Sequence, residues 1–260
     1  MRLTDAVVLV VGASGGIGSE CAGALGARGA RVMVHGRDAD RLDAVAADVG
    51  AKAIALDLTE PDGPERLVAA AREVHGRIDA VVHCEGVGWL GPIGDMPGTA
   101  VDELIAVNLT APVRITRAVL GEMSARGSGH ITFLASIAGW TGVANEALYA
   151  ATKAAVITFA DSLRIELAGS GIGVSVVSPA AVRTEFFDRR GVPYERRVPR
   201  PVSPQRVAEA VIDAVEHDRA HRMMPSWLAL APAVRAVAPG AFRWLNQRFG
   251  TSGSPRPVTG

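Results

Sequence analysis

The chain has 260 residues, 48% of them hydrophobic, and its 27 basic and 27 acidic side chains leave no net charge. This composition suits one large α/β domain. It argues against a nucleic-acid partner, because no basic run is long enough to follow a phosphate backbone. Cys21 and Cys84 fit neither a metal site nor a CxxC motif. We therefore expect no metal and a reducing, cytoplasmic location.

Short apolar runs rich in β-branched residues alternate with longer alanine-rich stretches along the chain. The runs predict buried parallel strands at 6–11, 31–36, 52–57, 79–83, 130–136 and 173–178. We interpret the first run as a strand rather than a signal peptide. The stretches between the runs predict helices at 16–28, 40–48, 62–75, 99–126 and 146–168.

This alternation predicts a single doubly wound Rossmann-type α/β domain, with a central, mostly parallel sheet and helices on both faces. We expect the domain to span 1–222, followed by a C-terminal helical extension over 223–250 and a disordered tail over 251–260. Ligands of such a sheet bind beyond the carboxyl ends of its strands. The proline- and arginine-rich stretch 179–204 is too long for an ordinary connection, and it is either a mobile lid over the site or a solvated loop.

The segment "VVGASGGIG" joins the first predicted strand to the first predicted helix. Gly12 allows a tight turn, Gly16 lets the backbone approach a pyrophosphate, and Gly18 lets the helix pack against the strand. The helix N-terminus then faces the anion. The position of the cluster favours a dinucleotide site, and the alternative is a glycine turn with no ligand.

The end of the second strand separates the two nicotinamide dinucleotides, because an acid there binds the ribose 2′-hydroxyl whereas an arginine accommodates a 2′-phosphate. Gly36 stands where the acid is expected, and Arg37 follows it. A planar, permanently charged guanidinium suits phosphate, so the sequence favours NADP(H) over NAD(H). Asp38 and Asp40 lie close by, and simple surface charge is the alternative for Arg37. Asp57, ending the third strand, either receives the adenine amino group or caps a helix.

Tyr149 and Lys153 lie four residues apart in a predicted helix, in a chain with only two tyrosines and two lysines. They therefore share a helix face. A nearby ammonium lowers a phenol pKa that is ordinarily about 10, which makes the tyrosine usable as a general acid or base. Lysine also carries three rotatable donors, enough for the phenol and for sugar hydroxyls. The alternative is a chance spacing.

Two more polar residues accompany this pair. Ser136 closes the fifth strand, where its hydroxyl could orient a substrate carbonyl, although a lone serine at a strand end is more often a turn residue. Asn108 is polar within the apolar helical stretch "IAVNLTAPV". It either holds a water in a proton relay or is a satisfied core amide.

Together these motifs resemble the short-chain dehydrogenase/reductase family over residues 4 to 217. The family's glycine motif reads "VGASGGIG", its YxxxK pair is Tyr149 with Lys153, and its "PGxVxT" reads "PAAVRT" at 179–184. The resemblance implies that Tyr149 is the acid/base, Ser136 positions the carbonyl, Lys153 holds the nicotinamide ribose and Asn108 anchors a water. It implies cofactor contacts from the following residues: Gly12, Ser14, Gly16, Ile17, Gly18, Arg37, Asp57, Leu58, Gly86, Asn108, Tyr149, Lys153, Pro179, Val182 and Thr184.

The sequence departs from the family pattern at three places. Val11 stands where the glycine loop usually begins with threonine, "HCEG" at 83–86 replaces "NNAG", and Ala180 replaces the glycine of "PG". The second change places an unexpected carboxylate, Glu85, near the cofactor. None of the three removes a proton-transfer group.

The predicted C-terminal extension combines apolar residues with arginines at their margins. Three uses fit this composition, namely a flap over an apolar substrate pocket, a subunit interface and a helix lying in a membrane interface, and packing as flap or subunit interface is favoured. The apolar residues are Trp227, Leu228, Leu230, Val234, Val237, Phe242, Trp244 and Leu245, and the arginines are Arg235, Arg243 and Arg248.

The sequence thus predicts an NADP(H)-dependent oxidoreductase that interconverts a ketone and a secondary alcohol by hydride transfer, acting on a fairly apolar substrate. We expect a homo-oligomer, with peripheral membrane contact through 223–249 as a further option. The alternative function is a dinucleotide-binding regulatory or scaffold protein that keeps the fold without the chemistry.

Overall fold

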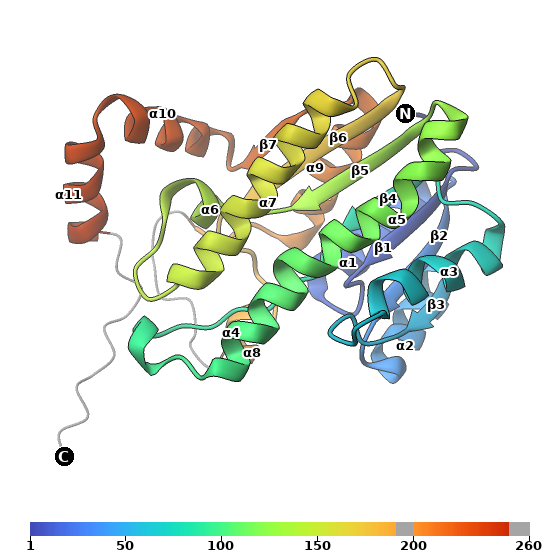
Figure 1. Ribbon diagram of the computed structural model, residues 1–260, viewed down its shortest axis with the longest axis horizontal. Coiled ribbons are helices and arrows are strands. Elements are labelled where there is room, and N and C mark those ends of the chain that lie inside the picture. The colour runs from blue at the N-terminus through green and yellow to red at the C-terminus, as the bar shows by residue number, and fades with distance from the viewer. Residues whose placement is uncertain (191–199, 250–260) are drawn as a thin grey trace.

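The computed structural model describes residues 1–190 and 200–249, with side chains as far as Trp244. Its centre is a seven-stranded sheet in the order β3-β2-β1-β4-β5-β6-β7, in which every neighbouring pair is parallel (Figure 1). The strands are β1 Val7–Val11, β2 Arg31–Gly36, β3 Lys52–Ala55, β4 Ala80–His83, β5 Gly129–Leu134, β6 Ile172–Pro179 and β7 His221–Met224.

Both faces of the sheet are covered by helices, as the continuous apolar strands require. Val8 and Val10 of β1 pack with the helices on one face, whereas Val7, Leu9 and Val11 pack with those on the other. Each face therefore has its own core. The first face carries α1 Gly16–Ala27, α2 Ala39–Val49 and α9 Pro204–His217, and the second carries α3 Gly63–His75, α5 Ala111–Arg126 and α7 Ala147–Glu166.

The helix expected over 99–126 is observed as three consecutive segments. These are α4 Gly98–Ile105, a π-helical turn η2 Ala106–Thr110, and α5. Pro112 has no N–H and its ring would collide with the carbonyl of Asn108 in a regular α-helix, which accounts for the widened turn. By length and composition the stretch Gly98–Arg126 could cross a membrane. However, Ile115 and Met123 are buried in the core of the second face.

The doubly wound fold class is confirmed, and several elements lie outside the predicted set. β7 adds a seventh strand, so the sheet reaches Met224, two residues past the expected end of the Rossmann-type domain. α9 follows the proline-rich stretch, capped by the Ser203 hydroxyl, which accepts from Arg206 N at 3.4 Å. The shorter elements are η1 Ile93–Asp95, α6 Ile137–Thr141, α8 Phe186–Arg189, η3 Ser226–Ala229, α10 Leu230–Val237 and α11 Pro239–Phe249. The expected tail at 251–260 falls outside the described residues.

Candidate functional site

The chain order of the strands reverses between β1 and β4, and there the helices after the two strands leave on opposite faces of the sheet. A cavity of about 540 Å³ lies at this edge, within the usual size of a ligand site. A second, smaller cavity adjoins it beyond the ends of β5 and β6. Ile17, Gly86 and Thr184 line both.

The glycine loop forms the floor of the larger cavity. Gly12 has φ +77°, and a Cβ there would lie 2.6 Å from the backbone N and Cα of Glu85. A Cβ at Gly18 would lie 2.4 Å from the Gly12 carbonyl oxygen. Both positions therefore require glycine. The cap residue of α1 is Gly15, which offers no side-chain oxygen to the first amides of the helix, so these amides are suited to an anionic ligand.

The end of β2 leaves little room for an acidic side chain. A Cβ at Gly36 would lie 2.7 Å from Ser14 Oγ, so an aspartate fits only if Ser14 moves. Arg37 and Arg41 both line the cavity. Arg37 pairs with Glu103 at 3.2 Å, and both side chains are about half exposed, at 54% and 42%. The guanidinium can therefore exchange this carboxylate for another anion at little cost.

Arg41 is a cavity residue that sequence reasoning missed. It lies on the first turn of α2, four residues after Arg37, and pairs with Glu185 at 2.6 Å. The four-residue spacing of the two arginines in "RDADR" could have indicated Arg41 as a cavity residue. Its partner Glu185 lies 144 residues further along the chain, and the sequence does not indicate that pairing.

Asp57 follows β3 and accepts two hydrogen bonds from Thr59, from the backbone N and from Oγ1, each 2.8 Å long. Burial acts to raise the pKa of Asp57, but these two bonds, together with the nearby Arg37 charge, hold the pKa below its usual value. The residue is therefore a carboxylate at neutral pH. It shapes the turn before α3, whose own N-cap is Asp62, and it also lines the larger cavity.

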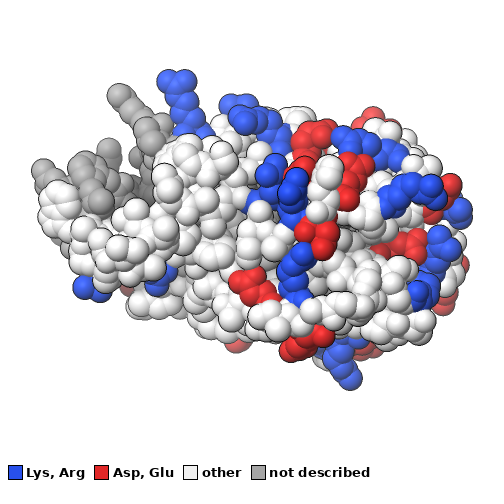
Figure 2. Space-filling view, turned by 90° about the horizontal axis from the view of Figure 1, so that it is seen from above, with Lys and Arg blue, Asp and Glu red and all other residues white. Residues whose placement is uncertain are grey.

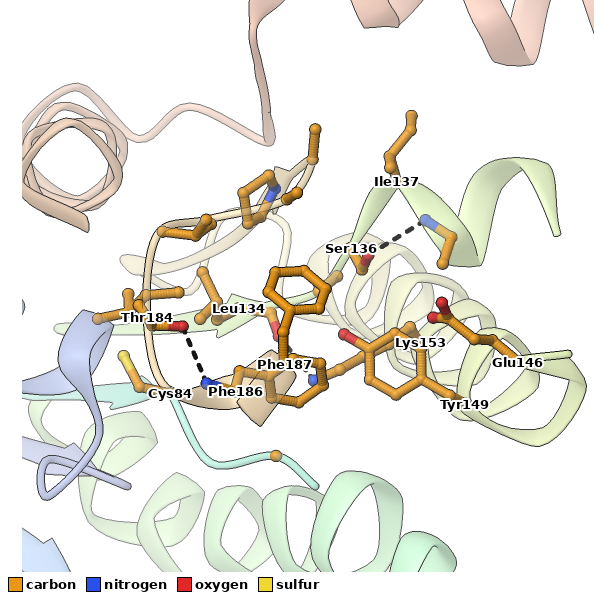
Figure 3. A pocket seen from close by; sticks show the side chains of 18 of the residues that line it. Cys84, Leu134, Ser136, Ile137, Glu146, Tyr149, Lys153, Thr184, Phe186 and Phe187 are labelled. Carbon is orange, nitrogen blue, oxygen red and sulfur yellow. Dashed lines mark hydrogen bonds between the residues drawn. The ribbon is translucent and has the colours of Figure 1, made fainter. Parts of the chain in front are cut away.

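Ser136, Tyr149 and Lys153 meet in the smaller cavity (Figure 3). Ser136 follows β5 as the N-cap of α6, where Oγ accepts from Ala138 N at 3.1 Å. Tyr149 and Lys153 project from one face of α7. Lys153 Nζ lies 5.9 Å from the centre of the Tyr149 ring and donates to the Leu134 carbonyl at 3.0 Å.

The expectation that Lys153 lowers the Tyr149 pKa is wrong for this structure. Burial raises the pKa of Tyr149 to about 12, the Glu146 carboxylate adds to the rise, and a hydrogen bond with Ser136 opposes it. Burial also lowers the pKa of Lys153 to about 8, with Glu85 acting in the opposite direction. Burial of the phenol therefore dominates, and the Lys153 ammonium, which donates to the Leu134 carbonyl and lies 5.9 Å from the ring centre, is not among the groups that shift the Tyr149 pKa.

The side chain of Asn108 is buried within the π-helical turn and fully engaged. Its Oδ1 accepts from Val87 N at 2.8 Å, and its Nδ2 donates to the Val87 carbonyl at 3.0 Å and to Thr152 Oγ1 at 3.3 Å. The amide thus ties the loop after β4 to two helices, as a satisfied core amide does. It lines neither cavity, although Gly86 beside Val87 does.

The unusual "HCEG" segment contains a buried pair between His83 and Glu85, and Glu85 also lines both cavities. His83 Nδ1 lies 2.8 Å from Glu85 Oε1, and only 3% and 5% of the two side chains is exposed. The His83 ring stacks on Phe133 with 4.9 Å between ring centres, and its Nε2 lies 3.3 Å from Thr116 Oγ1. The two polar residues therefore stabilise one another. Glu85 also brings negative charge toward Lys153.

The helix α8 supplies an apolar wall to the smaller cavity. Phe186 lies 5.7 Å from Tyr149 between ring centres, and Phe187 packs edge-on against Phe186. Arg190, whose side chain is 3% exposed, pairs with Glu146 at 2.8 Å and thereby ties α8 to the start of α7. The described part of the stretch 179–204, expected to be a lid or a solvated loop, thus lines the smaller cavity through α8, and residues 191–199 lie outside the described residues.

Most predicted site residues line the two cavities. Pro179 and Val182 line the smaller one beside the catalytic candidates, and Asn108 lies behind the wall. Sequence reasoning missed His35, Arg41, Glu103, Glu146, Phe186, Phe187 and Arg190. The predicted residues of the larger cavity are Gly12, Ser14, Gly16, Ile17, Gly18, Arg37, Asp57, Leu58, Gly86 and Thr184.

Comparison with known proteins agrees with this arrangement. The family described as short chain dehydrogenase matches residues 6–192. The chain belongs to the short-chain dehydrogenase/reductase family. It is similar to dehydrogenase/reductase SDR family member 7B of Danio rerio, with 35% identity over 196 residues. That match covers 71% of this chain but 63% of the fish protein, so this short-chain dehydrogenase/reductase spans under two thirds of the length of that relative.

Solved structures of other short-chain dehydrogenases share the fold. A short-chain dehydrogenase from Sphingobium yanoikuyae in complex with NADPH superposes with a TM-score of 0.79 and 29% identity, covering 98% of both chains. The 3-ketoacyl-(acyl-carrier-protein) reductase from Brucella melitensis, complexed with NADH, gives a TM-score of 0.77 and 26% identity, covering 85% of this chain and 97% of the other. Family membership makes this chain an oxidoreductase.

Proposed function

We propose that this oxidoreductase uses NADP(H) to interconvert a ketone and a secondary alcohol on an apolar substrate. The observation that carries the proposal is the meeting of Ser136 and Tyr149 in an apolar cavity that adjoins the glycine-loop crevice. Ile137, Val143 and Phe187 line that cavity and favour a substrate with hydrocarbon around its carbonyl.

The larger cavity fits a phosphorylated dinucleotide. The glycine floor admits a pyrophosphate, because a Cβ at Gly12 or Gly18 would collide with backbone. Gly36 withholds the acid that would bind a free 2′-hydroxyl, and the half-exposed Arg37 and Arg41 supply charge for a 2′-phosphate. The NADPH bound to the Sphingobium relative supports this choice, whereas the NADH of the Brucella reductase shows that the fold accepts either dinucleotide.

The bound nicotinamide supplies the hydride, and the chain supplies orientation and the proton. A phenol with a pKa of about 12 keeps its proton at neutral pH, so Tyr149 acts as an acid in the reducing direction. Ser136 donates to the substrate oxygen and stabilises the negative charge that develops there. Lys153, released from Leu134, has donors for the cofactor ribose.

We further propose that a water relay, if it involves Asn108, uses its main-chain carbonyl. The side-chain amide is fully occupied by Val87 and Thr152. Pro112 has no N–H to offer the Asn108 carbonyl, so this oxygen lacks the donor that a regular α-helix would supply.

Tyr149→Phe tests the catalytic proposal. The variant should lose turnover by about three orders of magnitude, while its affinity for NADPH stays within about twofold, because the hydroxyl acts on the substrate. NADPH binding is followed by fluorescence, and turnover by absorbance with carbonyl compounds of increasing hydrophobicity. Near wild-type turnover in the variant would contradict the role of Tyr149. NADPH binding by the wild-type protein without turnover on any carbonyl or alcohol would favour the non-catalytic alternative.

A further inference from the structure

The C-terminal arm, defined here as η3, α10 and α11 over residues 226–249, extends away from the sheet (Figure 1). The cis peptide bond between Met224 and Pro225 separates it from β7. The arm is joined to the body where η3 packs beside β7 and where α10 packs beside α6.

One side of η3 and α10 is apolar and exposed. Trp227, Leu230, Val234 and Val237 follow one another at intervals of three, four and three residues, which places them on one helix face. Their exposed fractions are 52%, 67%, 43% and 87%. Four large apolar side chains thus form a continuous stripe that no other described part of the chain covers.

Contacts away from the stripe hold the arm against the body. Leu228 of η3 is buried, with 6% of its surface exposed. Arg235 Nη1 donates to the Trp140 carbonyl of α6 at 2.6 Å. Because this contact uses the polar side of the helix, the body itself fixes the apolar stripe toward the outside. The stripe is therefore exposed while the arm is bound to the body.

The C-terminal end of the chain carries only positive side-chain charge. Every Asp and Glu lies at or before Asp218, and the remaining 42 residues contain six arginines and no acid. In Figure 2 the mixed acidic and basic side chains gather over the body, while the end that carries the arm is mostly uncharged. Trp244 on α11 adds a further exposed aromatic ring at 59%. The six arginines are Arg219, Arg222, Arg235, Arg243, Arg248 and Arg256.

We propose that the arm binds the surface of an anionic phospholipid bilayer. The stripe would enter the boundary between headgroups and acyl chains, where the amphipathic ring of tryptophan is favoured. The exposed Arg243 of α11 would lie at the level of the lipid phosphates, and each basic residue near such a surface adds to the attraction. A contact between two arms is less favourable, because it would bring arginines together with no carboxylate on either arm.

Flotation of the full-length protein with vesicles tests the proposal, independently of catalysis. We expect binding to vesicles of phosphatidylcholine with phosphatidylglycerol at least about tenfold stronger than to phosphatidylcholine alone, and weaker binding at high salt. The triple variant L230Q/V234Q/V237Q should bind the anionic vesicles at least about tenfold more weakly. It should keep the wild-type melting temperature and NADPH affinity, because all three side chains are exposed.

The matched control is I93Q/I165Q, which changes two isoleucines that are 60% and 77% exposed elsewhere on the surface. It should float as the wild type does. Equal loss of binding in the control, or no binding of the wild type to anionic vesicles, would overturn the proposal. A dimer in light scattering that is lost in the triple variant, with no vesicle binding, would instead identify the stripe as a contact between copies.

Discussion

Arg37→Ala should weaken NADPH binding selectively. The guanidinium is 54% exposed and pairs with Glu103 at 3.2 Å, so releasing that surface pair costs less than about 1 kcal/mol. A charge-assisted contact with a 2′-phosphate returns about 1.5–3 kcal/mol. The net contribution is about 1–2 kcal/mol, so the Kd for NADPH should rise about tenfold. The Kd for NADH should stay unchanged.

Glu103→Gln should change NADPH affinity in the opposite direction. It removes the carboxylate that competes for Arg37 and should tighten NADPH binding by up to about fivefold. Both variants are titrated with NADPH and with NADH by fluorescence. Arg66→Ala is the control, because Arg66 forms an equally exposed surface pair with Glu60. Equal weakening of both dinucleotides by Arg37→Ala, or wild-type protein that prefers NADH, would refute the assignment of Arg37.

Three further changes test the cofactor floor, the lysine and the core. Gly12→Ala should lower the free energy of unfolding by at least about 2 kcal/mol in urea titrations and abolish NADPH binding, because φ is +77° and the new Cβ would meet the Glu85 backbone at 2.6 Å. NADPH affinity should fall as the pH rises through about 8, since Lys153 loses its ammonium there. Glu85→Gln should shift that midpoint to lower pH because it removes the negative charge that opposes the effect of burial, and a midpoint unaffected by the change would contradict this role. Phe133→Ala should cost about 3–5 kcal/mol of unfolding free energy, because the ring is buried between His83 and Phe159, and a loss below about 1 kcal/mol would argue against this packing.

The sequence predicted those strands and helices that have a clear local pattern of apolar residues. The runs at β1 and β2 are apolar throughout because both faces of these strands are buried, and the alternation with helices then defines the sheet. β7 was missed because "HRMM" has no β-branched residue and becomes a strand through its pairing with β6. The start of α9 is indicated by Ser203 and Pro204, but both residues belong to the proline-rich stretch, which hides the helix start.

In the candidate site, too, local sequence spacing predicted some features, whereas features that depend on tertiary contacts could not be predicted. Residue types at fixed spacings located Tyr149, Lys153 and the glycine loop, because one helix face or one turn brings them together. The Tyr149 pKa could not be predicted this way, since it depends on burial and on how far the Lys153 ammonium lies from the ring. The pair between Glu146 and Arg190 joins segments 44 residues apart, and spacing does not reveal such contacts.

The contact between Gly36 and Ser14 bears on how cofactor preference could change during evolution or by design. An aspartate introduced at position 36 would place its Cβ 2.7 Å from Ser14 Oγ, so the Ser14 side chain would have to move to accept it. Replacing Ser14 by glycine first would open the space and leave Arg37 in place. Positions 14 and 36 are therefore coupled, and a redesign toward NADH would change them together.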